Sequence, residues 1–303
     1  MKGNYKYSTG QLFNFARESY FERTSRPIYA IVFLLPFIVF YEVGTILINT
    51  DVLNQSQVRV VAFVWLQNFL EYLGFGSKLA WMMPPLTVVI ILVGLQLTSH
   101  KRWSFGIGDI CPMAFECVLL AVPLIVLSLF LNTSVMPEAD IALYDSSVTC
   151  VQSEAVVSCS SVMARSLSVA EGAETEAMRS GSLLANIVTG IGAGIYEELI
   201  FRLILICLLM LLFQDVVRLS RKNSIILAVL VSAALFSVHH HIVYLDGRFG
   251  QGTPFNWMEF GFRAVAGVYF AVLFAIRGFG ITAGTHAFYD IIATVINSVF
   301  FQQ

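Results

Sequence analysis

Two adjacent glutamates and an arginine lie in the middle of a long apolar stretch of the sequence. Glu198 and Arg202 are four residues apart, so on a helix they share a face, with the acidic residue in the favourable N-terminal position. Glu197 is turned about 100° away from this pair, with Phe201 as its i+4 neighbour. Charges at membrane depth are costly and persist when they are paired, hydrated or used. We therefore expect Arg202 to neutralise Glu198 and Glu197 to be the reactive group, a general base or acid. The alternative is that both glutamates bond to Arg202 and to neighbouring helices.

Two later apolar segments also carry ionisable residues. The first ends in three consecutive histidines, residues 239–241, which occupy three different helix faces, so at most one or two of them can point at a common site. In the last segment His286 and Asp290 are spaced i and i+4, as a histidine and its orienting carboxylate would be. We expect these two groups and the glutamate pair to converge on one cavity.

Three alternating glycines precede the glutamates, at positions 190, 192 and 194. They are not a nucleotide-binding loop, because they lie within an apolar helical segment and no strand precedes them. Small residues four apart let another helix approach closely. Gly190 and Gly194 therefore predict a groove in which a second helix packs.

The elements that must position these residues are membrane helices. The chain has 303 residues, of which 57% are hydrophobic and only 13% charged, whereas soluble domains carry about a quarter charged residues. A net charge of −2 gives no case for a nucleic-acid partner. The sequence predicts an all-α, polytopic transmembrane bundle. Apolar runs near the ~20 residues that a spanning helix needs occur at residues 28–49, 79–98 (bent at Pro84-Pro85), 114–133, 183–213, 224–244, 257–276 and 281–300.

Residues 59–73 are apolar but carry Gln67, Asn68 and Glu71 on roughly one side, so this segment either spans or lies in the interface as an amphipathic helix. If it does not span and the N-terminus is cytoplasmic, the basic residues of the connecting segments all fall on the cytoplasmic side that they favour. These basic residues are Lys101, Arg102, Arg218, Arg221, Lys222 and Arg277. We therefore expect seven spans and one interfacial helix, or eight spans, in the inner (cytoplasmic) membrane.

The domain organisation follows from this topology. Residues 1–27 are predicted to be a cytoplasmic N-terminal tail and residues 28–303 a single transmembrane domain. An acidic loop at about residues 134–181 is predicted to be extracytoplasmic. It contains Cys150 and Cys159, which either form a disulfide in an oxidising compartment or remain free thiols. Their spacing, without a nearby histidine, does not indicate a zinc site.

Taken in order, the three ionisable motifs resemble those of the CAAX protease and bacteriocin-processing (CPBP, or Abi) family of intramembrane glutamate-dependent endopeptidases. The motifs are Glu197-Glu198-x-x-x-Arg202, Phe236-x-x-x-His240 and His286-x-x-x-Asp290. The resemblance covers about residues 182–300, which would then be the catalytic core.

The resemblance implies a protease with its site in a cavity inside the membrane, without a cofactor or a metal. In that family the first glutamate of the pair activates water. Carried onto this chain, Glu197 would be the base and His240 would hold the water. His286 would stabilise the oxyanion, and Glu198 and Arg202 would shape the site.

This chain departs from the common family pattern at Asp290, where many members have asparagine. An amide can donate a hydrogen bond to an oxyanion, but an ionised carboxylate cannot. Asp290 is therefore expected either to be protonated or to orient His286. His240 fits the motif spacing, although His239 or His241 could face the cavity instead.

The sequence thus predicts an intramembrane endopeptidase. Its expected partners are the lipid bilayer and a peptide or protein substrate. The sequence leaves open whether that substrate carries a lipid group or a membrane anchor. One alternative is a zinc-dependent membrane metalloprotease, with glutamate and histidine ligands drawn from three helices. Another is a non-catalytic immunity or scaffold protein of the same fold. A proton-coupled transporter ranks last, because the sequence shows no inverted repeat.

Overall fold

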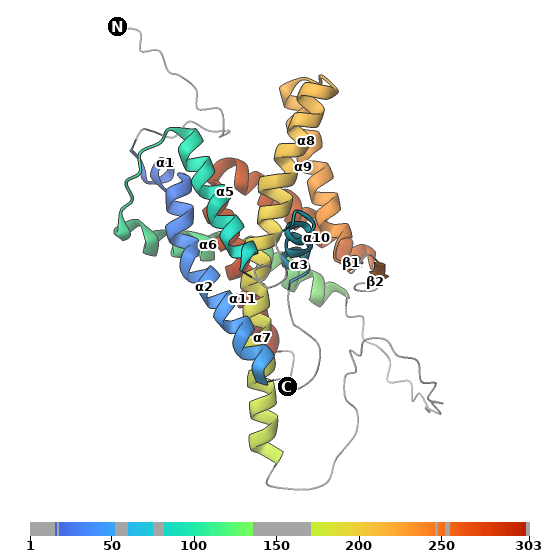
Figure 1. The fold of residues 1–303 in the computed structure, drawn as a ribbon. Coiled ribbons are helices and arrows are strands. Elements are labelled where there is room, and N and C mark those ends of the chain that lie inside the picture. The colour runs from blue at the N-terminus through green and yellow to red at the C-terminus, as the bar shows by residue number, and fades with distance from the viewer. Residues whose placement is uncertain are drawn as a thin grey trace.

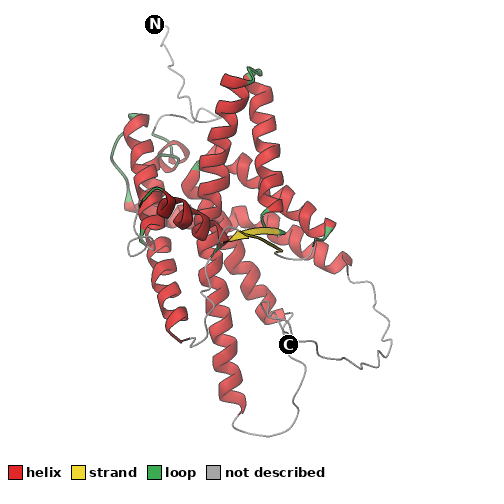
Figure 2. Cartoon of the chain, turned by 45° about the vertical axis from the view of Figure 1, so that its right-hand side comes forward, coloured by secondary structure: helices red, strands yellow, loops and turns green. Residues whose placement is uncertain are grey.

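The computed structural model describes residues 16, 18–51, 60–74, 82–135, 171–245, 248–251 and 255–300, which form a bundle of helices (Figure 1). The predicted all-α class is confirmed, apart from one antiparallel hairpin of β1 (Ile242–Leu245) and β2 (Arg248–Gln251). Figure 2 shows this hairpin in yellow at mid-height, among the helices. The long helices are α2 (Pro27–Asp51), α6 (Ile110–Val135), α7 (Glu171–Glu198), α9 (Arg221–Val238), α10 (Trp257–Arg277) and α11 (Phe279–Phe300).

Six helical segments of the described chain are long and apolar enough to cross a membrane, which makes this a multi-pass membrane protein. One of them runs from Leu183 to Val216, because α7 continues through the π-helical segment η2 (Leu199–Leu205), α8 (Ile206–Leu211) and a second π-helical segment, η3 (Leu212–Val216). The other five are contained in α2, α6 with the preceding turn η1 (Ile107–Asp109), α9, α10 and α11.

Two segments differ from their predicted form. The seventh predicted span is α5 (Met83–Ser99), whose 17 residues are fewer than the six longer spans have. Its bend at Pro84 and Pro85 was wrong, because both prolines lie at the start of the helix, where a missing N–H costs nothing. The ambiguous segment forms α3 (Val61–Tyr72), whose 12 residues extend only about 18 Å, too short to cross. Figure 1 shows α3 nearly end-on beside α7.

The predicted extracytoplasmic loop lies mostly outside the described residues, and so do Cys150 and Cys159. Its last part is helical, since α7 begins at Glu171. In the described part of the tail predicted for residues 1–27, the short helix α1 (Tyr20–Thr24) is capped by the Ser19 side chain.

Helices α7 and α11 pack closely because glycines face α11. A Cβ built on Gly194 would lie 2.5 Å from the backbone nitrogen of Ala287, and one on Gly190 would lie 2.7 Å from the Cβ of Asp290. The predicted groove at these two glycines is therefore confirmed, and the helix that occupies it is α11. On its other side α11 packs against α2, where a Cβ on Gly280 would meet Ala30 at 2.8 Å.

A buried ion pair fixes the end of α10 just before α11 begins. Arg277, 5% exposed, donates to both carboxylate oxygens of Glu116 in α6, at 2.6 and 2.8 Å. It also donates to the Phe21 carbonyl and the Thr24 hydroxyl, at 2.9 and 2.8 Å, and so ties α1 to the same point. The Tyr20 hydroxyl donates to Glu116 at 2.8 Å, and burial together with this hydrogen bond raises the pKa of Tyr20.

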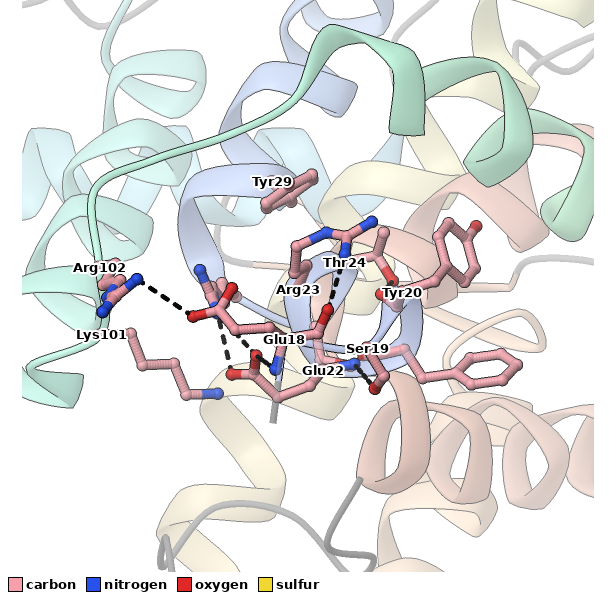
Figure 3. Close-up of polar contacts among 12 residues, drawn as sticks. Glu18, Ser19, Tyr20, Glu22, Arg23, Thr24, Tyr29, Lys101 and Arg102 are labelled. Carbon is pink, nitrogen blue, oxygen red and sulfur yellow. Dashed lines mark hydrogen bonds and ion pairs between the residues drawn. The ribbon is translucent and has the colours of Figure 1, made fainter. Parts of the chain in front are cut away.

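A second set of ion pairs joins α1 to the α5–α6 connection (Figure 3). Arg26 pairs with Glu22 at 2.6 Å and with Glu18 at 3.2 Å, while Arg102 lies 3.5 Å from Glu18. Burial opposes the ionisation of Glu22, but the hydrogen bonds from Arg26 outweigh it and lower the pKa of this carboxyl. The tail thus clasps the bundle at the α10–α11 turn and at the α5–α6 connection.

Substitution of alanine at Gly194 and at Gly261 separates close packing from helix propensity. Gly194→Ala forces the new methyl into the backbone of α11, and overpacking of this kind costs about 1–3 kcal/mol. Gly261 in α10 has nothing within 4 Å of a built Cβ, so Gly261→Ala should be neutral or stabilising by up to ~1 kcal/mol. Thermal unfolding in detergent measures both, and equal effects would contradict the packing described.

Glu116→Ala should destabilise the protein, because it leaves the Arg277 guanidinium buried without its main partner. Breaking one side of a buried ion pair costs about 3–5 kcal/mol. The control is Glu71→Ala, at an exposed glutamate that accepts a hydrogen bond from Gln67 at 3.3 Å on the same helix. An unfolding midpoint for Glu116→Ala equal to that of the control would contradict a stabilising role for the Arg277–Glu116 ion pair.

Candidate active site

The second glutamate contacts an arginine and a histidine. Glu198 Oε2 lies 3.1 Å from Arg202 Nε, an ion pair between two fully buried side chains that lacks hydrogen-bond alignment. Glu198 Oε1 lies 2.7 Å from His286 Nδ1 in α11. The Arg202 guanidinium stacks over the Phe236 ring, 4.1 Å from its centroid. The sequence prediction that Glu198 pairs with Arg202 is therefore confirmed, and His286 is an additional partner.

Glu198 is the last residue of α7, and the π-helical segment η2 follows it at once. Such segments are rare and occur mostly at functional sites, because the extra residue per turn shifts the side chains that follow. Arg202 lies inside η2 and still reaches back to Glu198. The Ser232 hydroxyl of α9 donates to the Phe201 carbonyl at 2.7 Å, so this turn also has a bond to its neighbouring helix.

The first glutamate faces the histidine run instead. Helix α9 ends at Val238, and residues 239–241 form the turn that follows. Glu197 Oε1 lies 3.5 Å from His239 Nε2, and the rings of His239 and His240 are 3.9 Å apart between centroids. A ring nitrogen of His240 also lies within 4.8 Å of the ligand atoms of Glu197 and His239.

One carbonyl oxygen orients both histidines. The Nδ1 atoms of His239 and His240 both face the carbonyl of Phe236, at 3.0 Å for His240. A carbonyl only accepts, so both Nδ1 atoms must carry hydrogen, and the neutral rings then have a lone pair on Nε2. In the neutral ring the lone pair of His239 faces the Glu197 carboxylate across 3.5 Å, whereas a ring protonated on both nitrogens would form an ion pair there. A proton donor or a cation between the two acceptors would satisfy both.

His286 lies between two carboxylates. Its Nδ1 contacts Glu198 at 2.7 Å and its Nε2 lies 3.5 Å from Asp290 Oδ2. Phe270 of α10 stacks on the imidazole, with 4.6 Å between centroids and 17° between planes. Asp290 thus lies beside His286, in the place from which it can orient the ring.

A cavity of about 520 Å³ adjoins these residues. It lies between α6, the end of α9, α10 and α11, and its wall includes His240, His286, Asp290 and Arg263. Glu197 is not part of the wall; it contacts His239, whose ring lies against His240 in the wall. The third histidine points elsewhere, since His241 Nε2 lies 3.5 Å from Arg263 and its ring packs against Phe255.

The structure brings the residues predicted from sequence into one cluster; these are Glu197, Glu198, Arg202, His240, His286 and Asp290. Their catalytic roles remain predictions. The cluster also includes His239, which is the histidine in contact with Glu197. The sequence had left open which of the three consecutive histidines faces the site. The aromatic rings of Phe236 and Phe270 were not predicted to take part.

Sequence reasoning also missed Glu42. This carboxylate lies within the span Pro27–Ile48 and accepts a hydrogen bond from the buried Tyr196 hydroxyl at 3.2 Å. A single glutamate inside the first apolar run was the available signal, since ionisable residues at membrane depth usually have a partner or a role. The bond joins α2 to α7 one residue before Glu197.

Three of the clustered side chains could hold a metal ion. One ligand atom each from Glu197, His239 and His240 lie within 4.8 Å of one another. Two imidazoles and a carboxylate, with a fourth position open, are a donor set that catalytic zinc uses. The lone pairs on the Nε2 atoms fit this requirement.

Comparison with known proteins finds a family that the region of the cluster resembles. No curated protein and no solved structure matches the chain. Residues 179–292 match a family described as Type II CAAX prenyl endopeptidase Rce1-like, and this range contains every residue of the cluster. The match agrees with the resemblance carried by the three motifs, and over these residues the chain is similar to the CAAX protease family.

Proposed function

We propose that this protein is an intramembrane endopeptidase that hydrolyses a peptide bond with a water molecule activated by Glu197. The observation that carries the proposal is the position of Glu197 opposite His239 and His240, beside a cavity inside the helix bundle. The match to an endopeptidase family over residues 179–292 supports the same reaction class.

The geometry supports a mechanism in which two groups share the water. A water between Glu197 and the histidines donates one hydrogen to the carboxylate and the other to an Nε2 lone pair. Glu197 takes the first proton, and the hydroxide attacks the scissile carbonyl in the cavity. Glu197 then gives the proton to the leaving amine, so water is consumed and the carboxylate is restored.

His286 is placed to stabilise the oxyanion. Glu198 accepts from its Nδ1–H, while Nε2 faces Asp290 and the cavity. A ring that carries hydrogen on both nitrogens satisfies both carboxylates and can turn Nε2–H toward the developing negative charge. Asp290 then orients the ring, which is one of the two roles expected for it.

The substrate is proposed to be a peptide or protein with a lipid group or a membrane anchor, because the cavity lies among membrane spans. We further propose the inner membrane as its location, with the N-terminus cytoplasmic. Helix α1 and the connection between α8 and α9 both lie in the upper half of Figure 1. Arg23 belongs to α1, Arg218 to the connection, and Arg221 is the first residue of α9. Basic residues gathered at one end favour the cytoplasmic side for that end.

Replacement of the base should abolish cleavage without loss of protein. Comparison of protein termini in membranes from cells with wild-type protein, Glu197→Gln and the control Glu71→Gln tests this by mass spectrometry. Wild type and Glu71→Gln should share new termini that Glu197→Gln lacks, because removing a general base costs about 10²–10⁴ in rate.

Unchanged termini in the stably expressed Glu197→Gln protein would contradict the mechanism. Identical termini with and without the protein altogether would favour the non-catalytic immunity or scaffold role.

A zinc-dependent endopeptidase is the second candidate, favoured by the Glu197, His239 and His240 ligand set. A bound zinc ion would supply a water of lowered pKa at this position. In that case Glu197 and both histidines bind the ion, and His286 keeps its place in the cavity wall.

Metal content separates the two candidates. The proposal of a Glu197-activated water predicts well below one equivalent of metal in the purified protein and activity that survives chelators. The zinc alternative predicts about one equivalent, lost in His239→Ala and retained in His241→Ala, since ligand loss lowers affinity sharply. The His241→Ala control removes a histidine that faces Arg263 instead.

A further inference from the structure

The last helix carries a stripe of polar residues that extends beyond the candidate active site. His286, Asp290, Thr294 and Asn297 are spaced by four, four and three residues along α11. Residues at these intervals share one face of a helix. The face that presents His286 and Asp290 to the cavity therefore continues as a hydroxyl and an amide toward the C-terminal end of α11.

A second cavity follows this face. It has a volume of about 380 Å³ and lies between α6 and α11, with Ser128, Ala293, Thr294 and Asn297 in its wall. Ser128 also lines the cavity that holds His240 and His286. The two spaces are therefore adjacent, with Ser128 in the wall of both, and we call the pair the α6–α11 groove, which follows α11 from the candidate active site.

Two polar side chains of this α6–α11 groove, Thr294 and Asn297, are not used by the described part of the fold, whereas Ser128 is hydrogen-bonded to Tyr289. Hydroxyls elsewhere in these helices bond to their own backbone, as Thr282 does to Gly278 at 2.9 Å and Ser298 to Val295 at 2.9 Å. Within the described part of the chain, Thr294 and Asn297 have no such bond. Polar groups inside an apolar span are costly unless they are hydrated or bonded to something else.

The groove has the length of a short peptide. Asp290 and Asn297 are seven residues apart, so the stripe extends about 10 Å beyond the active-site aspartate. An extended chain rises about 3.3 Å per residue, so about three residues fit in this length. A polypeptide in a membrane must satisfy its own backbone N–H and C=O groups. Side chains that both donate and accept hydrogen bonds suit a peptide backbone as the occupant of the groove, whereas an acyl chain would leave them without partners.

We propose that the α6–α11 groove is a binding subsite for an extended segment of the substrate polypeptide, about three residues long, on one side of the scissile bond. Thr294, Asn297 and Ser128 bond to its backbone, and the scissile carbonyl then lies beside His286. The inference rests on the proposed endopeptidase function, since it places the substrate of that same site.

The experiment compares two bulky substitutions that differ in which side of α11 they occupy. Ala293→Trp fills the groove, whereas Val295→Trp adds the same side chain at an exposed position outside it. The probes are synthetic peptides that span a cleavage site dependent on Glu197, at full length and shortened by three residues from either end. Rates are measured on purified wild type, both tryptophan variants and Glu197→Gln.

Ala293→Trp should raise KM for the full-length peptide about tenfold, with kcat nearly unchanged, because it removes binding away from the reacting bond. The peptide shortened on the groove side should have the same KM with wild type and with Ala293→Trp. Val295→Trp should behave as wild type. An equal rise of KM for all three peptide lengths, or the same effect in Val295→Trp, would overturn the subsite.

A smaller change guards against misfolding of Ala293→Trp. Thr294→Val keeps the shape of the side chain and removes its hydroxyl, and the lost hydrogen bond should raise KM about threefold to tenfold for the peptides that keep the groove-side residues. No change in KM with Thr294→Val would also count against the subsite. Failure of the purified wild-type protein to cleave the full-length peptide would refute the proposed function itself, an outcome distinct from groove variants that behave as wild type.

Discussion

The arrangement depends on how the charge of Glu198 is neutralised inside the bundle. The carboxylate has Arg202 on one oxygen and His286 on the other. The side chains of Glu198 and Arg202 are both fully buried. A buried charge that loses its partner costs several kcal/mol, so α7 and α11 must keep the register in which these groups meet. With Glu198 engaged in this way, its neighbour Glu197 is left to face His239 and His240. One glutamate therefore supports the site and the other is available for chemistry.

Close helix packing makes that register possible. Gly190 and Gly194 remove the side chains that would hold α11 away from α7, and the contact at Gly190 is with Asp290 itself. At the other end of α11 the Arg277–Glu116 pair fixes the turn from α10, and α1 closes over it. The polar stripe on α11 then extends from His286 to Asn297 along a surface that these two constraints hold in place.

Local spacing predicted the parts of the site that depend on a single helix. The Glu198–Arg202 pair and the shared face of His286 and Asp290 follow from intervals of four residues, and the structure has both. The histidine register could not be predicted, because α9 ends at Val238 and the histidines occupy a turn rather than helix faces. Pro84 and Pro85 were read as a bend, although proline also suits the first turn of a helix. The Glu198–His286 contact joins residues far apart in the chain, and only tertiary packing reveals it.

The central claim is that Glu198 has a structural role and Glu197 the reactive one. Thermal unfolding of purified Glu197→Gln and Glu198→Gln tests it most directly, because stability responds to the supporting residue and not to the reactive one. We predict that Glu198→Gln lowers the free energy of unfolding by about 3 kcal/mol or more, since it leaves Arg202 buried without its counter-charge. Glu197→Gln should change it by less than about 1 kcal/mol, as is usual for a neutral isostere away from a structural ion pair. Equal destabilisation by both variants, or a larger effect at Glu197, would contradict the account.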